Sequence, residues 1–136
     1  MAATNDRALV GLVIVSHSAS IADGVAEIVA QVAGPDVAII TAGGGPDGTL
    51  GTDGDRVRAA LRRADSGAGA VVLVDLGSAL LSVRAALAEF DGEANLVLAD
   101  APLVEGAISA GVTAATGVPL ADVVVAAEEA RGARKL

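Results

Sequence analysis

The residue best suited to chemistry in this sequence is His17, the single histidine of the chain. It lies in the segment Val15-Ser16-His17-Ser18, directly after an apolar run over residues 9–15. A neutral imidazole has an unperturbed pKa of about 6.5 and is a competent nucleophile at neutral pH. If the apolar run is a buried strand, His17 stands at its carboxyl end, where open parallel α/β sheets bind ligands. Taken alone, a single histidine is more often a surface residue without a role, and its position at the strand end makes the two interpretations equally good.

Asp75 is the best candidate for a residue that supports this histidine. It follows a second apolar run, residues 70–74, and therefore ends another expected strand. A carboxylate bonded to one ring nitrogen selects the tautomer and stabilises the imidazolium that forms during nucleophilic attack. In that arrangement Nε2 is the nitrogen left free to attack. The alternative is that Asp75 merely caps the helix that follows it, as Asp commonly does.

Four more residues are candidates for binding phosphate oxygens. Gly77 and Ser78 open an expected helix, Thr52 stands at the start of another, and Ser18 follows the histidine. Amide groups at a helix start, together with hydroxyl groups, can hold phosphate oxygens. The same residues are also ordinary helix caps, so the pattern leaves both interpretations open.

Alternating strands and helices must position these side chains. The apolar patterns predict strands over 9–15, 37–40, 70–74 and 95–98, and helices over 20–33, 52–64, 77–90, 102–115 and around 120–127. Capping-box spacing suggests that Ser20 and Thr52 start the first two helices. The expected fold is an α/β domain with an open parallel four-stranded sheet in the order 2-1-3-4 and helices on both faces. This order places the first and third strands side by side, so that His17 and Asp75 meet at one edge.

Composition limits the domain organisation and the location. A chain of 136 residues suits one domain, expected over 9–130, with a flexible segment over 1–8 and a basic tail over 131–136. Although the mean hydropathy is +0.62, no apolar run reaches the roughly 18–20 residues that cross a bilayer. The start of the chain lacks the apolar core of a signal peptide. We therefore expect a cytoplasmic protein that does not insert into membranes.

Charge and residue types argue against several functions. A formal net charge of −8 and 1% aromatic residues disfavour nucleic-acid binding, which needs basic surface and stacking platforms. With one histidine and no cysteine, the sequence argues against a metal site, although carboxylates could still hold magnesium. The glycine-rich segment 43–45 lacks the Gly-Lys-Ser/Thr ending of a P-loop. We therefore expect this chain to bind neither nucleotide nor any other cofactor by itself.

Three segments together resemble the phosphoryl-donor subunits of bacterial dihydroxyacetone kinase, which are related to the IIA domains of the mannose-type sugar phosphotransferase system. The segments are residues 12–18, 75–82 and 101–106, and Gly51-Thr52-Asp53 also matches. The resemblance covers about residues 9–130. Mannose-type IIA domains usually carry a Trp-Gly-Gly-Ser-Pro-like turn after the third strand, where this chain has Leu76-Gly77-Ser78-Ala79 and no tryptophan. This difference favours the kinase branch over the sugar-transport branch.

The resemblance implies a phosphotransferase that works through phosphohistidine. His17 would be phosphorylated by the histidine phosphocarrier protein, with Asp75 as its supporting carboxylate. The phosphoryl group would pass to ADP on the nucleotide-binding subunit of the kinase, and the resulting ATP would phosphorylate dihydroxyacetone on a third subunit. Family members are commonly homodimers. Two alternatives are a mannose-family IIA component that serves a sugar-specific IIB partner, and a non-catalytic regulator with a receiver-like fold that signals through Asp75.

Overall fold

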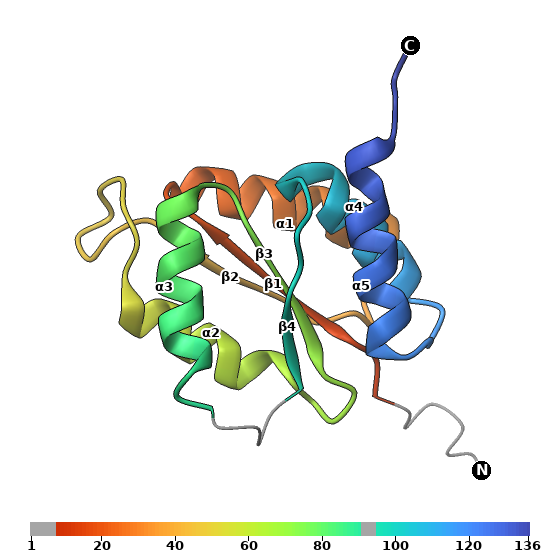
Figure 1. Cartoon of the computed structure of the whole chain (residues 1–136), viewed down its shortest axis with the longest axis horizontal. Helices are drawn as coiled ribbons and strands as arrows, with labels where there is room; N and C mark the ends of the chain where they lie inside the picture. Colours follow the sequence, from red (N-terminus) through yellow and green to blue (C-terminus); the bar gives the residue numbers. More distant parts are fainter. Residues whose placement is uncertain (1–7, 91–94) are drawn as a thin grey trace.

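Four parallel strands form the centre of the molecule in the computed structural model, which describes residues 8–90 and 95–136 (Figure 1). The strands are β1 (Gly11–Ser16), β2 (Ile39–Gly43), β3 (Ala70–Val74) and β4 (Leu96–Leu98). They pair in the order β2-β1-β3-β4, with every pair parallel. The predicted class and strand order are therefore confirmed. The order brings the carboxyl ends of β1 and β3 together near the middle of one sheet edge.

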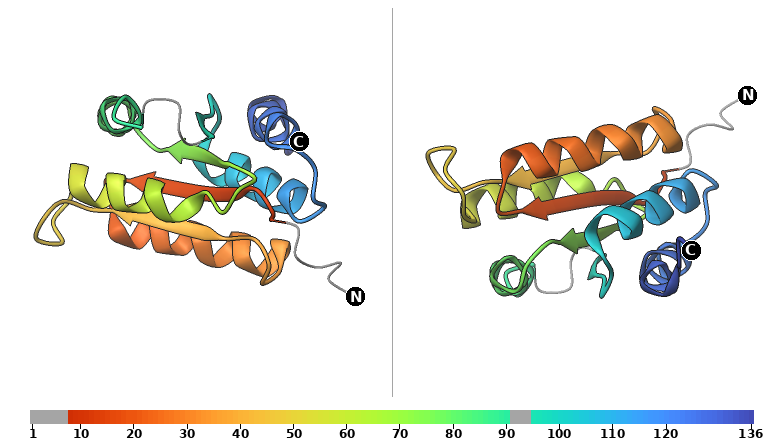
Figure 2. Two further views of the ribbon diagram at one scale, coloured as in Figure 1. Left: turned by 90° about the horizontal axis from the view of Figure 1, so that it is seen from below. Right: turned by 90° about the horizontal axis from the view of Figure 1, so that it is seen from above.

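Helices cover both faces of the sheet. One face carries α1 (Ala19–Ala33), α4 (Leu103–Ala114) and α5 (Leu120–Glu129), which continues into a short 3₁₀ turn (Ala130–Gly132). The other face carries α2 (Gly54–Ala64) and α3 (Gly77–Leu87). Seen from below, α2 lies in front of the strands, and seen from above, α1 and α4 do (Figure 2). Because side chains alternate along a strand, β1 contributes to two separate cores.

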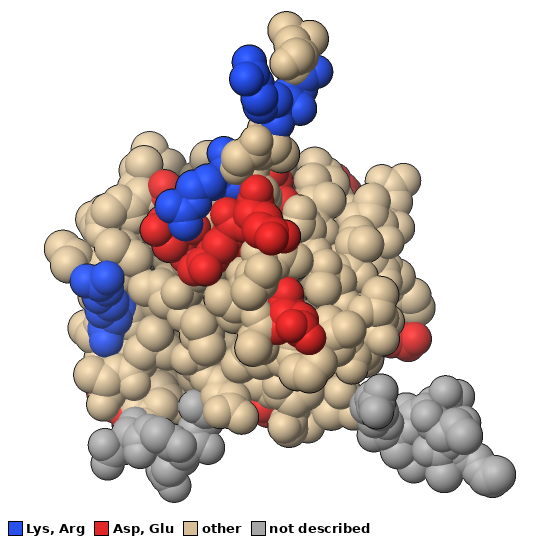
Figure 3. All heavy atoms as spheres, turned by 45° about the vertical axis from the view of Figure 1, so that its right-hand side comes forward, with Lys and Arg blue, Asp and Glu red and all other residues tan. Residues whose placement is uncertain are grey.

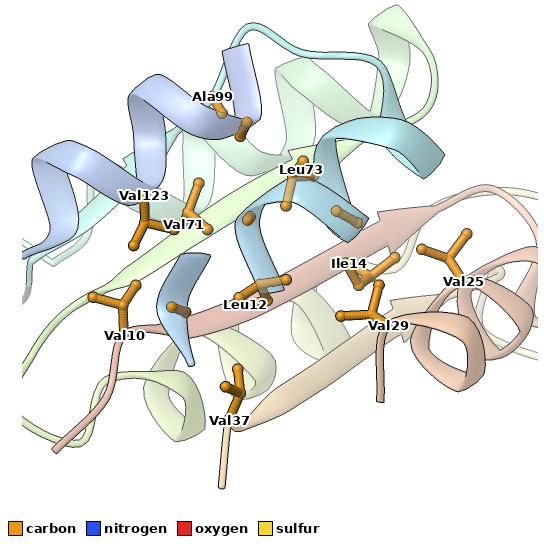
Figure 4. Close-up of a cluster of buried hydrophobic side chains, with 14 of the residues drawn as sticks. Val10, Leu12, Ile14, Val25, Val29, Val37, Val71, Leu73, Ala99 and Val123 are labelled. Atoms are coloured by element: carbon orange, nitrogen blue, oxygen red, sulfur yellow. The ribbon is translucent and has the colours of Figure 1, made fainter. Parts of the chain in front are cut away.

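The larger core lies between the sheet and the three-helix face. Leu12 and Ile14 of β1 and Leu73 of β3 point into it and are completely buried (Figure 4). Val25 and Val29 of α1 meet them from the helical layer. Full burial of a leucine or valine stabilises a fold by about 1.5–3 kcal/mol relative to exposure. Both sides of β1 are therefore anchored, which holds the residues at its end in a defined position.

The first two helices begin at other residues than the capping pattern suggested. Ser18, not Ser20, caps α1: its Oγ accepts from the Ile21 amide at 3.2 Å. Asp53, not Thr52, caps α2, where its carboxylate accepts from the Asp55 amide at 3.0 Å. Both predictions were wrong because several hydroxyl and carboxyl residues precede each helix. The cap is the residue with extended backbone at the point where the chain turns into the helix.

Other boundaries differ by a few residues. β2 covers residues 39–43 rather than 37–40, and α3 ends at Leu87 rather than near Phe90. Pro102 precedes α4 as its N-cap, because its ψ of 139° is extended. The expected flexible segment over residues 1–8 lies almost entirely outside the described residues. None of the described helices is long and apolar enough to cross a bilayer.

The basic C-terminal segment makes two ion pairs with the body of the protein. Arg131 lies 3.3 Å from Asp100, and Lys135 lies 3.2 Å from Glu105. Basic and acidic side chains accordingly lie close together at the foot of the C-terminal tail (Figure 3). All four side chains are well exposed, so these contacts are solvated surface pairs of small energetic weight.

Candidate functional site

Pairing of β1 with β3 brings His17 and Asp75 together. Val15 is level with Val74 in this pair, so the next residues of both strands leave the sheet side by side. Nδ1 of His17 lies 3.1 Å from Oδ1 of Asp75. The side chains are 22% and 15% exposed, respectively, so both are largely enclosed but not sealed from solvent. The contact expected from the strand order is present.

Three further donors hold the Asp75 carboxylate. The Ser16 hydroxyl donates to Oδ2 at 2.7 Å, and the His17 amide donates to the same oxygen at 2.9 Å. The Leu76 amide donates to Oδ1 at 2.7 Å. Burial by itself raises the pKa of Asp75, but the hydrogen bonds from Ser16, His17 and Leu76 outweigh it and hold the pKa below its ordinary value. Asp75 is therefore ionised across the physiological pH range.

The ionised carboxylate determines which ring nitrogen of His17 is free. A carboxylate only accepts hydrogen bonds, so Nδ1 must carry the ring proton, and the lone pair of the neutral ring is on Nε2. Nε2 points the other way and contacts the hydroxyl of Ser78 on α3. The serine donates to Nε2 in this state and must turn aside when an electrophile approaches. The site thus presents a nucleophilic Nε2 with a carboxylate behind it.

Main-chain hydrogen bonds fix the segment that carries His17. The amide of Gly44 donates to the Ser16 carbonyl at 3.1 Å, and the amide of Gly51 donates to the His17 carbonyl at 2.9 Å. Gly44 has a φ of +82°, which a residue with a side chain adopts only with strain. The glycine-rich loop between β2 and α2 therefore supports the backbone on both sides of the histidine. This loop projects from the body of the molecule (Figure 1).

The structure separates the four candidate phosphate ligands. Gly77 and Ser78 form the first turn of α3 next to Nε2, and no side chain caps this helix. The start of this helix therefore lacks a side-chain acceptor for its amides. The Ser18 hydroxyl already accepts from the Ile21 amide as the cap of α1. Thr52 follows Gly51 near the His17 backbone and is half-buried. The first two residues consequently have the better geometry for a phosphoryl group.

Sequence reasoning gave no role to Ser16, although its hydroxyl is part of the site. It is the one fully buried polar residue among those the structure describes, at 0% exposure. Its Oγ donates to Asp75 and accepts from the Ser18 amide at 3.1 Å, so the hydroxyl is satisfied on both sides. The signal that could have identified Ser16 is its position as a hydroxyl residue within an otherwise apolar strand that is fully buried.

Within residues 8–90 and 95–136, no three histidine, aspartate or glutamate side chains come together in a way that could hold a metal ion. Histidine and aspartate meet here as a pair, and the remaining ligands of that pair are serine hydroxyls and backbone amides. The chemistry of this donor set is that of a nucleophilic imidazole rather than that of a cation site.

Comparison with known proteins relates this chain to phosphotransferase proteins. Residues 11–124 match the family described as PTS system fructose IIA component. A phosphoryl donor subunit DhaM of PEP-dependent dihydroxyacetone kinase from Providencia stuartii is 38% identical over 132 residues, or 93% of this chain. The chain spans only 28% of the length of that relative. A subunit of the same description from Listeria innocua is 37% identical over 106 residues, covering 76% of this chain and 85% of the relative.

Solved structures share this fold. A crystal structure of a protein described as of unknown function superposes with a TM-score of 0.78 at 33% identity, covering 88% of this chain and 93% of the other. The phosphotransferase system component EIIA from Streptococcus agalactiae superposes with a TM-score of 0.69. Its sequence identity is 20%, with coverage of 93% and 97%, so this second likeness concerns the fold alone.

Proposed function

Because the chain belongs to the family of PTS system fructose IIA components, we propose that it is a phosphocarrier that supplies phosphoryl groups to a dihydroxyacetone kinase through His17. The observation that carries the proposal is the orientation of the imidazole. Asp75 contacts Nδ1, and Nε2 faces the first turn of α3. The names of the relatives support the choice of dihydroxyacetone kinase as the system that is served.

The proposed relay has two transfers, both at His17 and both in the cytoplasm. A histidine phosphocarrier protein donates the phosphoryl group to Nε2. The group then passes to ADP on the nucleotide-binding subunit of the kinase, and the ATP formed phosphorylates dihydroxyacetone on a third subunit. This chain holds neither nucleotide nor sugar in the relay, and we expect it to act as a homodimer.

Each transfer balances without a proton leaving the site. In the first, the Nε2 lone pair attacks phosphorus, and the bond between phosphorus and the donor nitrogen breaks with its electrons returning to the donor. The phosphorylated ring keeps its Nδ1 proton and gains positive charge, which the Asp75 carboxylate compensates. In the second, a β-phosphate oxygen of ADP attacks phosphorus, and the electrons of the Nε2–P bond return to Nε2.

In this proposal, the first turn of α3 stabilises the phosphoryl group during transfer. Phosphoryl transfer leaves little covalent chemistry to the protein, so positioning and charge stabilisation dominate. The Ser78 hydroxyl stands at Nε2, and the amides of Gly77 and Ser78 belong to an uncapped helix start. Donors of this kind stabilise phosphoryl oxygens as negative charge develops on them.

The geometry of the site disfavours one of the two alternative functions and leaves the other open. A receiver-like role needs Asp75 as phosphoryl acceptor, but hydrogen bonds engage both of its oxygens, and Ser16 and His17 stand where receivers carry acidic residues. The geometry therefore disfavours that role. A IIA component that serves a IIB partner needs the same phosphohistidine, so only the acceptor distinguishes it from the proposed function.

Transfer of label from phosphoenolpyruvate tests the proposal. The mixture contains the general phosphotransferase enzyme, the histidine phosphocarrier protein and this chain, followed by the ADP-loaded kinase subunit. We expect acid-labile label on the wild-type chain, its movement to ADP, and no label on a folded His17→Ala variant. Label on the variant would overturn the role of His17. Label that passes to a sugar-specific IIB protein but not to ADP would establish the alternative acceptor.

A further inference from the structure

Three leucines near the site are unusually exposed. Leaving aside the C-terminal Leu136, Leu50, Leu81 and Leu76 are the most exposed large apolar side chains of residues 8–90 and 95–136, at 81%, 66% and 59%. A single exposed leucine is ordinary, because much of any protein surface is apolar. A group of them around one site indicates a surface that another molecule covers.

Leu76 contacts the His17–Asp75 pair itself, whereas Leu50 and Leu81 are placed near it by neighbouring residues that do. Leu50 precedes Gly51, whose amide donates to the His17 carbonyl at 2.9 Å. The Leu76 amide donates to Asp75. Leu81 lies three residues after Ser78 on α3 and hence on the same side of the helix, where Ser78 contacts Nε2. We call Leu50, Leu76 and Leu81 the leucine rim.

The exposed side of α3 extends this apolar surface. Arg84 is the one charged residue of the helix, and its exposed neighbours include Ala85. A helix with one face in solvent normally carries many polar residues on that face. Beside α3 lies a groove of about 690 Å³, which begins at Asp75 and Leu76 and has Arg84 in its lining. The lining of this groove combines apolar side chains with one positive charge, Arg84, and two carboxylates, Asp75 and Asp100.

Charge is segregated between the two faces of the molecule, although the chain as a whole is acidic. The helices α1, α4 and α5 carry acidic residues and no basic ones: Asp23, Glu27, Glu105, Asp122, Glu128 and Glu129. The helices α2 and α3 carry a single acidic residue, Asp55, and five arginines: Arg56, Arg58, Arg62, Arg63 and Arg84. Four of these arginines are on α2, where Arg56 pairs with Asp53 and Arg58 pairs with Asp55 and Glu89, so the basic residue on the helix that His17 faces is Arg84 of α3. A partner that docks there is favoured by an acidic surface.

We infer that the leucine rim and Arg84 form the docking surface for the protein that takes the phosphoryl group from His17. The inference rests on the proposed function and adds the chemistry of the partner: apolar side chains that cover the rim, with carboxylates placed to meet Arg84. Phosphoryl acceptors are anionic, which the positive charge beside the groove complements. Covering the rim also removes water from Nε2 and protects the phosphohistidine from hydrolysis during transfer.

Discharge of chemically phosphorylated protein tests the surface without involving the protein donor. His17 is loaded with phosphoramidate, and transfer to the ADP-loaded kinase subunit is measured over a range of acceptor concentrations. The variants are Leu81→Glu and Arg84→Glu, with Val125→Glu on α5 as the matched control, since Val125 is 51% exposed. We expect Leu81→Glu to raise the acceptor KM about tenfold or more with kcat nearly unchanged. Arg84→Glu should raise KM and weaken its dependence on salt, and Val125→Glu should match wild type.

Several results would overturn the inference. One is a wild-type acceptor KM in both Leu81→Glu and Arg84→Glu, and another is an equal rise in Val125→Glu. A change in oligomeric state on sedimentation of Leu81→Glu would assign the rim to a second copy of this chain. Slower charging by the phosphocarrier protein with unchanged discharge would assign it to the donor. Failure of the wild-type protein to discharge onto ADP contradicts the proposed function itself, which separates that failure from failure of the docking surface.

Discussion

A buried hydroxyl stands behind the carboxylate that supports the candidate nucleophile. Ser16 donates to Asp75 and accepts from the Ser18 amide, so it links the end of β1 to the start of α1. Asp75 in turn contacts Nδ1 of His17. The orientation of the imidazole therefore depends on a residue that never approaches the phosphoryl group. Ser16 is a positioning residue in this arrangement.

Replacement of Ser16 tests that dependence. Ser16→Ala removes a donor from Asp75 and leaves the Ser18 amide without its acceptor, so we expect a loss of about 1–3 kcal/mol in the free energy of unfolding. Phosphorylation of His17 should slow, and nitrogen NMR should show a smaller share of the Nδ1–H tautomer. Ser16→Thr, which keeps the hydroxyl, serves as the control and should restore the tautomer. A wild-type tautomer ratio in Ser16→Ala would show that the hydroxyl only stabilises the fold.

Replacement of Asp75 tests the carboxylate itself. Asp75→Asn keeps the size of the side chain but no longer compensates the charged ring, and an amide behind histidine can select the wrong tautomer. We expect phosphorylation at pH 7 to slow by up to about 10⁴-fold, the loss known for a triad aspartate changed to asparagine. A rate within about tenfold of wild type would leave Asp75 as a structural residue, since one general acid–base contact alone contributes more.

The lowered pKa of Asp75 also gives a pH dependence of stability. Its pKa is below the unfolded value of about 3.9, so the ionised group stabilises the fold above that pH. This contribution is lost as the pH falls through the folded pKa. Urea unfolding should therefore show a difference between wild type and Asp75→Asn at pH 5 that shrinks below about pH 4. A difference that grows with acidity would contradict the direction of the shift.

Close packing where β2 meets α1 fixes the segment that contains His17. A Cβ on Gly43 would lie 2.7 Å from the Cα of Ala19 and 2.9 Å from the Cβ of Ala22, so backbone has to move to accept it. We expect Gly43→Ala to lower the free energy of unfolding by about 1–3 kcal/mol and to slow phosphorylation, because the histidine follows β1 at this junction.

The matched control for this change is a glycine on α1. A Cβ on Gly24 meets nothing within 4 Å. Gly24→Ala should therefore raise the free energy of unfolding by about 0.5–1 kcal/mol, because alanine loses less backbone entropy in a helix. Chemical denaturation of both variants compares them directly. Equal effects of the two substitutions would show that the contact at Gly43 has no special weight.

Stability of the protein as a unit depends on the two cores rather than on the site. Leu73 is completely buried in the larger core, whereas Leu81 is 66% exposed on α3. We expect Leu73→Ala to cost about 2–5 kcal/mol of unfolding free energy and Leu81→Ala to stay within about 0.5 kcal/mol of wild type. Thermal and urea unfolding measure both. A large loss for Leu81→Ala would mean that the leucine rim serves the fold rather than a partner.

Much of this architecture could be predicted from apolar patterning. The runs before His17 and Asp75 are short and continuous, which is typical of central parallel strands, and their alternation with helices indicates a parallel sheet. Helix starts could not be predicted, because Ser18 and Ser20 both fit a capping pattern and only the turn of the backbone selects one. The exposure of Leu81 was also hidden, since apolar residues at helical spacing look alike whether a core or a partner covers them.

The loop that carries Leu50 holds the histidine through its backbone alone. The Gly44 and Gly51 amides make the contacts to the carbonyls of Ser16 and His17, and no side chain of the loop tip takes part in those two bonds. Within residues 46–50, positions other than Gly48, whose φ is +77°, can therefore diverge in sequence without removing these two bonds. Recognition of the partner protein and reactivity of the histidine can evolve independently. Exchanging this short stretch between related proteins is therefore a direct way to redirect one phosphohistidine toward a different acceptor protein.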